Sequence, residues 1–239
     1  ENCGEAIART RDGGYTLGAC FDGDADRVKF ILPNGTMLGD DVVAAIFALH
    51  LLQPDESYVT PVNASGLLRF GVESRGGRLV ECRIGQPPTD TKVRECSAAM
   101  ASESNAGKFG FAEFGCCYDG PYAVAKMLGI MATTGKTLAE LVSELPLFFQ
   151  AEVGIAVDDA RKAQVTVAAI AVVRAQLGSE IERTDTTDGT KWFLSGQRWL
   201  LLRPSGTEPL VRAYSDARSQ QEAEALTALS RAAFEQALS

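Results

Sequence analysis

Two hydrophobic periods alternate over the first two thirds of the chain. Short runs rich in β-branched and aromatic residues predict strands, whereas apolar positions spaced three and four apart predict helices. Strands, the last with its loop, are expected at residues 15–21, 28–32, 58–62, 78–82 and 108–115, and helices at residues 1–10, 40–53, 67–75, 89–101, 119–132 and 137–145. This alternation is typical of an α/β layer that contains parallel strands.

The pattern changes after Pro146, which ends the last helix predicted for this layer. Two long helices, at residues 164–177 and 220–238, each carry one apolar stripe, and short strands are predicted at residues 191–194 and 199–202. We therefore expect a smaller α+β domain with an antiparallel sheet, whose two helices pack on one face of that sheet.

Three aspartates alternate with small residues directly after the first predicted strand. The segment reads DGDAD, so the backbone can curl until the carboxylates of Asp22, Asp24 and Asp26 converge. Carboxylate oxygens are the ligands that Mg²⁺ prefers. A solvated acidic turn is the simpler alternative, and an EF-hand is disfavoured because Pro33 stands where its twelfth-position Glu would be. Arg27 follows the aspartates and is placed to contact a phosphate held by the same metal.

A second polar segment follows the strand predicted at residues 199–202. It reads RPSGTEPLVR and combines two guanidinium groups, two hydroxyls and the amides around a glycine. Such donors complement a phosphate dianion, whereas a polar turn between two strands is the simpler alternative. The candidate phosphate ligands are Arg203, Ser205, Gly206, Thr207 and Arg212.

Composition narrows the classes of partner and compartment. The 31 acidic and 23 basic residues give a net charge of −8, which argues against nucleic acid as a partner. No apolar run approaches the roughly 20 residues of a membrane-spanning helix, so no membrane partner is expected. The six cysteines form no C-x-x-C pair, which favours the reducing cytoplasm.

The segments DGDADR and RPSGTEPLVR together resemble the α-D-phosphohexomutase superfamily, which includes phosphomannomutases, phosphoglucomutases and phosphoglucosamine mutases. The resemblance implies a phosphohexomutase-like α/β domain with a mixed sheet, followed by a smaller α+β domain with an antiparallel sheet. It assigns residues 1–40 to the tail of the family's second domain with the metal loop. Residues 41–147 correspond to the third, sugar-binding domain, and residues 148–239 to the C-terminal, phosphate-binding domain.

The same resemblance implies an isomerase that moves a phosphoryl group within one phosphorylated sugar. Mg²⁺ would be held by Asp22, Asp24 and Asp26, with Arg27 in a supporting position. The C-terminal ligands Arg203, Ser205, Gly206, Thr207 and Arg212 would hold the other phosphate of the substrate.

The sugar-binding loop departs from the family pattern. The family sequence FGGEESGH corresponds to FGFAEFGC at residues 109–116, so Ala112, Phe114 and Cys116 replace residues that recognise sugar hydroxyls. Glu113 is retained and is the remaining candidate sugar ligand. A further family turn corresponds to Ile84-Gly85-Gln86, where the amide of Gln86 can still hydrogen-bond a ligand, and a polar turn residue without a ligand is an equal alternative.

The family's phosphoserine domain has no counterpart in this sequence, in which His50 is the only histidine. We therefore expect a truncated chain that is inactive alone and that a missing N-terminal catalytic domain would complete. Two alternatives are a non-catalytic, metal-dependent phospholigand-binding protein and a subunit completed by a separate catalytic chain.

Overall fold

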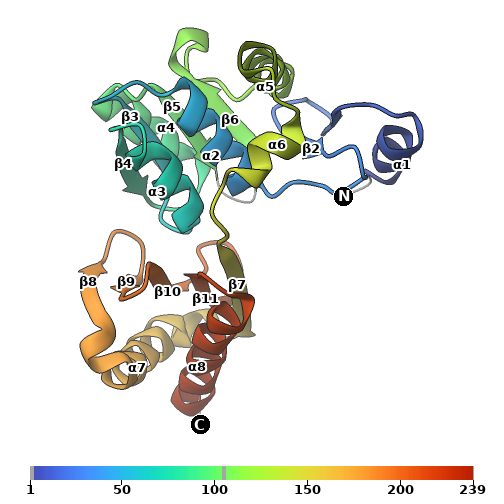
Figure 1. Cartoon of the computed structure of the whole chain (residues 1–239). Coiled ribbons are helices and arrows are strands. Elements are labelled where there is room, and N and C mark those ends of the chain that lie inside the picture. Colours follow the sequence, from blue (N-terminus) through green and yellow to red (C-terminus); the bar gives the residue numbers. More distant parts are fainter. Residues whose placement is uncertain (1–2, 104–105, 239) are drawn as a thin grey trace. The chain divides into compact units, whose positions relative to one another are not determined.

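The structure is a computed structural model that describes residues 3–103 and 106–238. The chain divides between Pro146 and Leu147 into two compact units, here called unit 1 and unit 2 (Figure 1). Unit 1 holds a mixed sheet and unit 2 an antiparallel one, which confirms the predicted α/β class. None of the helices in the described part of the chain is both long enough and apolar enough to cross a bilayer.

Unit 1 begins with helix α1 (Gly4–Asp12) and a two-stranded hairpin. Strands β1 (Gly18–Phe21) and β2 (Val28–Ile31) are antiparallel, and Phe21 lies opposite Val28 at the end of the ladder. The acidic segment is therefore the loop of this hairpin. A bridge between Ile31 and Met37 continues the pairing beyond the turn at Pro33.

A four-stranded sheet forms the centre of unit 1, in the order β4-β3-β5-β6. Strand β3 is parallel to both neighbours, and β6 is antiparallel to β5. The strands are β3 (Ser57–Pro61), β4 (Arg78–Cys82), β5 (Met100–Glu103) and β6 (Lys108–Phe111). Because β4 and β5 lie on opposite sides of β3, the carboxyl end of β3 is a topological switch point, where α/β folds commonly place ligands.

The prediction of one helix over residues 89–101 is wrong at its end. Helix α4 (Gln86–Cys96) stops at Ser97, whose backbone is left-handed with φ 48°. Met100 pairs with Tyr58 of β3 and is buried, so its apolar side chain serves a strand and not a helix face. Pairing with distant strands therefore overrides the helical pattern of this segment.

The remaining helices of unit 1 pack around an aromatic core. They are α2 (Asp40–Leu51), α3 (Gly66–Glu73), α5 (Gly120–Thr134) and α6 (Leu138–Ser143), and a short 3₁₀ turn, η1, covers Ala112–Phe114. Phe47 of α2 is fully buried, and its ring meets those of Phe109 and Phe111 edge-on at 5.3 and 5.2 Å. This contact fixes α2 against β6.

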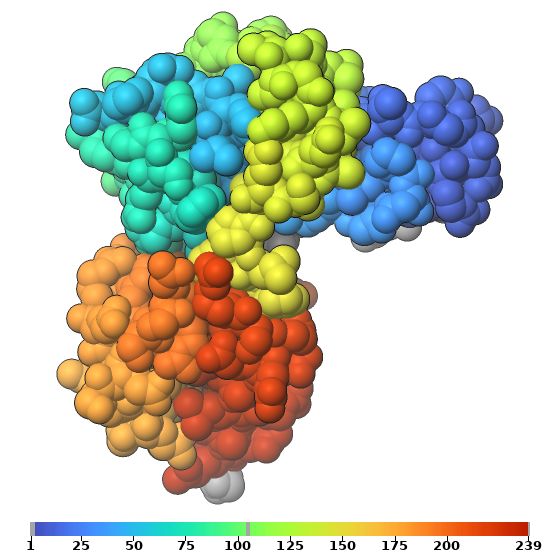
Figure 2. Space-filling model, in the orientation of Figure 1, coloured from blue at the N-terminus to red at the C-terminus, as the bar shows by residue number. Residues whose placement is uncertain are grey.

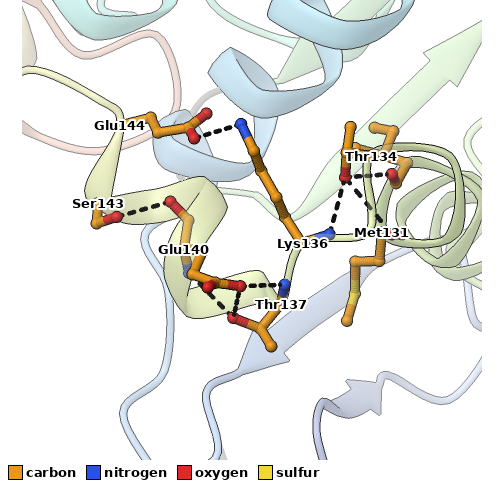
Figure 3. Close-up of polar contacts among 8 residues, drawn as sticks. Met131, Thr134, Lys136, Thr137, Glu140, Ser143 and Glu144 are labelled. Carbon is orange, nitrogen blue, oxygen red and sulfur yellow. Dashed lines mark hydrogen bonds and ion pairs between the residues drawn. The ribbon is translucent and has the colours of Figure 1, made fainter.

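The connection from α5 to α6 is held by local capping (Figure 3). The hydroxyl of Thr137 accepts a hydrogen bond from Glu140 N, and the Glu140 carboxylate accepts from Thr137 N, which makes a capping box. Lys136, before α6, forms an ion pair with Glu144 at the other end of this helix. These contacts explain why the short helix begins where the sequence predicts.

Unit 2 is built on a five-stranded antiparallel sheet in the order β7-β11-β10-β9-β8. Its strands are β7 (Phe149–Ala156), β8 (Ile181–Asp185), β9 (Thr190–Leu194), β10 (Arg198–Pro204) and β11 (Leu210–Ala217). The sequence prediction missed β7 and β8 as strands. Only Val153 of β7 and no residue of β8 is buried, so neither strand shows the alternation of buried and exposed positions that marks a core strand.

Two helices cover one side of this sheet (Figure 1). Helices α7 (Asp159–Leu177) and α8 (Gln220–Leu238) contact the strands and each other, as predicted, and the 3₁₀ turn η2 (Gly178–Glu180) follows α7. Helix α7 starts five residues earlier than predicted because the side chain of Asp158 caps it by accepting from Ala160 N at 3.2 Å. Figure 2 shows α8, in red, along the surface of unit 2.

Candidate functional site

The metal loop, residues 22–26, brings three carboxylates together on the surface of unit 1. One oxygen each from Asp22, Asp24 and Asp26 lies within 4.8 Å of the others. The loop turns at Ala25, whose φ is 58° and whose N–H donates to the Asp22 carbonyl at 3.3 Å. A small side chain is suited to that left-handed position. The sequence prediction that the three aspartates converge is therefore consistent with the observed geometry.

The base of the metal loop is tied to more distant parts of unit 1. Gly120 N, at the start of α5, donates to Ala25 O at 2.8 Å, and Val28 N donates to Gly107 O at 2.9 Å. Gly107 N in turn donates to the buried carboxylate of Asp40 at 2.9 Å. Gly107 has φ 68°, and a Cβ there would lie 2.8 Å from the Val28 carbonyl. The loop is thus held in place by backbone contacts that leave its carboxylates exposed.

Two cationic side chains lie next to the carboxylates of the metal loop. The Nε of Arg27 lies 3.5 Å from Asp22 Oδ2 and 3.7 Å from Asp26 Oδ1. Lys108 Nζ lies 2.7 Å from Asp26 Oδ2, and the lysine is 6% exposed. The sequence prediction missed Lys108. The available clue was a lysine that begins an otherwise apolar strand, where an unpaired charge is unfavourable.

The donor set of the metal loop fits a hard divalent cation. Asp22, Asp24 and Asp26 supply only carboxylate oxygens, which suit Mg²⁺ better than a softer metal. Because each carboxylate oxygen has more than one lone pair, the oxygens that contact Arg27 and Lys108 can still bind a metal.

The cationic loop, residues 203–212, connects β10 to β11 in unit 2. Arg203 and Arg212 are opposite each other in the antiparallel ladder, so their two guanidinium groups start from neighbouring positions. Ser205 N donates to Leu210 O at 2.9 Å and closes the loop. The strand-turn-strand arrangement inferred from the sequence is therefore present.

Within the cationic loop, the buried hydroxyl of Ser205 organises the turn. Its Oγ accepts from Glu208 N at 3.2 Å and lies 3.5 Å from Thr207 N. Lys162 of α7 donates to the carbonyls of Ser205 and Glu208 at 2.9 and 3.0 Å. Gly206 and Thr207 are exposed at the tip. Lys162 was missed from the sequence, because only the packing of α7 brings it to the loop.

Both arginines of the cationic loop have carboxylate partners. Arg203 Nε lies 3.1 Å from Asp188 Oδ2, and these two side chains are 11% and 9% exposed. Arg203 Nε is itself enclosed, so a ligand would meet the terminal nitrogens of the guanidinium. Arg212 pairs with Glu152 of β7 and with Glu208. Burial disfavours the charged form of Arg212, but its hydrogen bonds to the two glutamates outweigh this and raise the pKa of the guanidinium above its ordinary value.

Comparison with known proteins places this arrangement in one family. The family model "Phosphoglucomutase/phosphomannomutase, alpha/beta/alpha domain III" matches residues 39–148, and the model of the C-terminal domain of the same family matches residues 152–232. The chain belongs to the phosphoglucomutase/phosphomannomutase family. The metal loop lies outside both matched segments, and the cationic loop lies inside the second.

Similar proteins span about twice the length of this chain. A phosphoglucomutase/phosphomannomutase of Thermococcus kodakarensis is 34% identical over 227 residues, which cover 94% of this chain and 48% of the relative. A crystal structure of a phosphoglucomutase/phosphomannomutase family protein from Burkholderia thailandensis matches with a TM-score of 0.83 and 25% identity, over 99% of this chain and 50% of that one. The fold also matches Aspergillus fumigatus N-acetylphosphoglucosamine mutase, solved with GlcNAc-6P and magnesium, with a TM-score of 0.69, 17% identity and coverage of 91% and 48%.

In this member of the phosphoglucomutase/phosphomannomutase family, Glu113, the candidate sugar ligand, has protein partners. Glu113 accepts from Lys126 Nζ at 2.6 Å and from the Tyr122 hydroxyl at 3.4 Å. Burial acts to raise the pKa of Glu113, but these hydrogen bonds and the lysine charge lower it overall. The ring of Phe114 stacks on Tyr122 with centroids 4.5 Å apart. The carboxylate of Glu113 is thus paired with Lys126 of α5, and the charge of the lysine balances its own.

A pocket of about 360 Å³ opens beside the metal loop in unit 1. Its walls come from the metal loop, from one face of α4 and from the segment after the 3₁₀ turn. The lining residues are Asp26, Gln86, Asp90, Val93, Arg94, Gly115, Cys116, Cys117 and Tyr118. Burial raises the pKa of the Cys116 thiol, so this cysteine is a poor nucleophile.

Proposed function

We propose that this chain is the metal- and phosphate-binding part of a phosphosugar mutase, an isomerase that transfers a phosphoryl group within one hexose phosphate. Membership of the phosphoglucomutase/phosphomannomutase family supports the reaction class. The observation that carries the proposal is the convergence of three carboxylates within 4.8 Å in the metal loop. The whole activity needs residues that this sequence does not contain, because the family's phosphoserine motif does not occur in it.

Asp22, Asp24 and Asp26 are the proposed Mg²⁺ ligands. When bound, the metal would neutralise negative charge on a phosphoryl group beside the loop. Arg27 approaches two of these carboxylates and, in this proposal, contacts an oxygen of the same phosphoryl group. The Aspergillus relative was solved with magnesium, which is consistent with the same cofactor here.

The cationic loop is the proposed site for the second phosphate that the sugar carries in its bisphosphate form. The exposed tip offers the amide of Gly206 and the hydroxyl of Thr207, while Ser205 shapes the turn. Arg203 and Arg212 supply positive charge. Both terminal nitrogens of Arg212 already pair with Glu152 and Glu208, so a phosphate would compete with these carboxylates. To accept a hydrogen bond from a sugar hydroxyl, Glu113 would have to give up its contact with Lys126.

The metal assignment is tested by titrating Mn²⁺ into the parent chain and into Asp24→Asn, followed by water-proton relaxation. Removal of one hard carboxylate ligand should weaken binding at least tenfold, or roughly 1.5 kcal/mol or more. The matched control is Asp12→Asn, which removes an exposed aspartate that pairs with Arg11 outside the metal loop. Equal Mn²⁺ affinity in the parent and Asp24→Asn would refute the metal site.

The phosphate assignment is tested separately with inorganic phosphate and Arg203→Ala. Loss of a charge-assisted contact should reduce phosphate affinity by roughly ten- to a hundredfold, which corresponds to about 1.5–3 kcal/mol. Arg198→Ala, which removes an arginine paired with Glu180 elsewhere in the same sheet, is the control. If Arg203→Ala binds phosphate as tightly as the parent does, the cationic loop is only a turn.

A second candidate function is metal-dependent binding of a phosphorylated ligand without turnover. The contact of Glu113 with Lys126, at 2.6 Å, favours it because the retained sugar ligand is already satisfied by the protein. The two functions differ in one assay. Phosphorus NMR of glucose 1-phosphate with the longest native form of the protein would show a new hexose 6-phosphate signal for a mutase and binding alone for the alternative.

The proposal includes a separate source for the phosphoserine domain. This domain belongs either to the same polypeptide or to a second chain. We also propose that the protein acts in the cytoplasm, where sugar phosphates and reduced cysteines coexist. Size measurement of the native complex separates a longer polypeptide from a two-chain enzyme.

A further inference from the structure

Lys108 connects the metal loop with the pocket beside it. It begins β6, and all four residues of that strand are buried. Its Nζ lies 2.7 Å from Asp26 Oδ2 and 2.8 Å from Gln86 Oε1, and both of these partners line the pocket. A buried ammonium group needs such partners. One lysine therefore holds a proposed metal ligand and a pocket amide at the same time.

The contact with Lys108 determines which end of the Gln86 amide faces the pocket. An ammonium group has three donors and no acceptor, so the glutamine must present its oxygen to it. The two N–H donors of Gln86 then point away from Lys108. Among the residues that the structure describes, none accepts a hydrogen bond from Gln86 Nε2. Gln86 thus offers donors to whatever occupies the pocket.

The surroundings of Gln86 favour an anionic acceptor over a neutral one. Gln86 is the first residue of α4, and the N-terminus of a helix carries a partial positive charge. Arg94, two turns further along α4, lines the same pocket. The acidic wall residues are Asp26, which Lys108 pairs, and Asp90. A phosphoryl oxygen is the acceptor that also suits a metal at Asp26.

We propose that Lys108 is a positioning residue that turns the amide donors of Gln86 toward a phosphoryl oxygen of the ligand, beside Asp26. The inference rests on the proposed function, since the ligand is the phosphorylated sugar of that proposal. Lys108 acts through Gln86, which contacts the ligand. In the same arrangement, Lys108 contacts Oδ2 of Asp26, so a metal at this carboxylate would bind Oδ1, which lies 3.7 Å from Arg27 Nε.

The test uses the whole chain carrying Arg203→Ala, so that the single phosphate of the probe, glucose 1-phosphate, binds beside Asp26 and not in the cationic loop. Mg²⁺ is present, and affinities come from calorimetry. Gln86→Leu removes the donors, and Lys108→Met removes the group that orients them while it keeps side-chain length. Each change should weaken glucose 1-phosphate binding about tenfold. Lys108→Arg, which keeps a donor-only cation, should restore most of the affinity.

A double-mutant cycle separates positioning from an independent contact. If Lys108 acts through Gln86, then Lys108→Met should have little further effect in the Gln86→Leu background. Mn²⁺ affinity without sugar phosphate should not fall in Lys108→Met, because a competing cation next to Asp26 has been removed. A merely structural role would instead lower Mn²⁺ affinity, glucose 1-phosphate affinity and thermal stability together.

Three results would overturn the inference. They are equal glucose 1-phosphate affinity in the parent and the single variants, losses that multiply in the double variant, and a joint fall of metal and ligand binding in Lys108→Met. Gln86→Leu keeps the test decisive if Lys108→Met does not fold. A parent chain that binds no glucose 1-phosphate in the presence of Mg²⁺ would defeat the proposed function as well, which distinguishes the two failures.

Discussion

Removal of Asp188 should destabilise unit 2 far more than removal of an exposed carboxylate. Asp188 and Arg203 are 9% and 11% exposed, and the two charged atoms are 3.1 Å apart. Asp188→Ala leaves the arginine enclosed without its counter-charge, and loss of one partner of a buried ion pair costs about 3–5 kcal/mol. With a urea m-value of about 2 kcal/mol/M, the unfolding midpoint should fall by roughly 1.5–2.5 M.

Tryptophan fluorescence during urea unfolding measures this change in unit 2. The chain has two tryptophans, Trp192 and Trp199, and both are buried in the sheet of unit 2. Glu180→Ala is the matched control, because Glu180 pairs with an arginine at 2.6 Å in the same unit but is 49% exposed. That variant should lose at most about 1 kcal/mol. If Asp188→Ala lost no more than Glu180→Ala, the buried pair would not stabilise the cationic loop as inferred.

Three further predictions concern other contacts. Glu152→Gln removes a negative charge from Arg212 and should strengthen inorganic phosphate binding by roughly two- to fivefold in calorimetry; weaker binding would contradict the site. The pKa of Glu113 is lowered in the folded state, so its contribution to stability is present above the unfolded-state pKa and is lost as the pH falls through the folded-state pKa. Glu113→Gln should therefore be less stable than the parent to urea at neutral pH and equal to it in acid, unless Lys126 finds another partner. Phe47→Ala should destabilise unit 1 by about 3–5 kcal/mol in circular dichroism, and a loss below about 1 kcal/mol would mean that the core repacks.

The sequence alone determined the features that depend on local chemistry. The DGDAD segment combines small residues with alternating carboxylates, so a tight acidic turn is predictable from the residue pattern, while contacts with Gly107 and Gly120 hold its base in place. The strand-turn-strand form of the cationic loop likewise follows from its own glycine and serine. Helix α8 has the predicted bounds, and the face that it buries combines apolar residues with Thr227 and Ser230.

Contacts between distant segments could not be predicted in the same way. Met100 belongs to a strand only because β3 and β6 are available to pair on either side. The partners of Lys108 lie 82 and 22 residues away in the chain, at Asp26 and Gln86, so no local pattern indicates that this lysine joins the metal loop to the pocket.

The charge state of the candidate site was also decided by tertiary structure. A motif shows that Arg203 and Arg212 are present but not which carboxylates face them. Asp188 and Glu152 reach these arginines from the turn before β9 and from β7, and they reduce the positive charge that a phosphate would meet. Electrostatic interactions depend on distance and burial, and both are set by the packing of strands that are far apart in sequence.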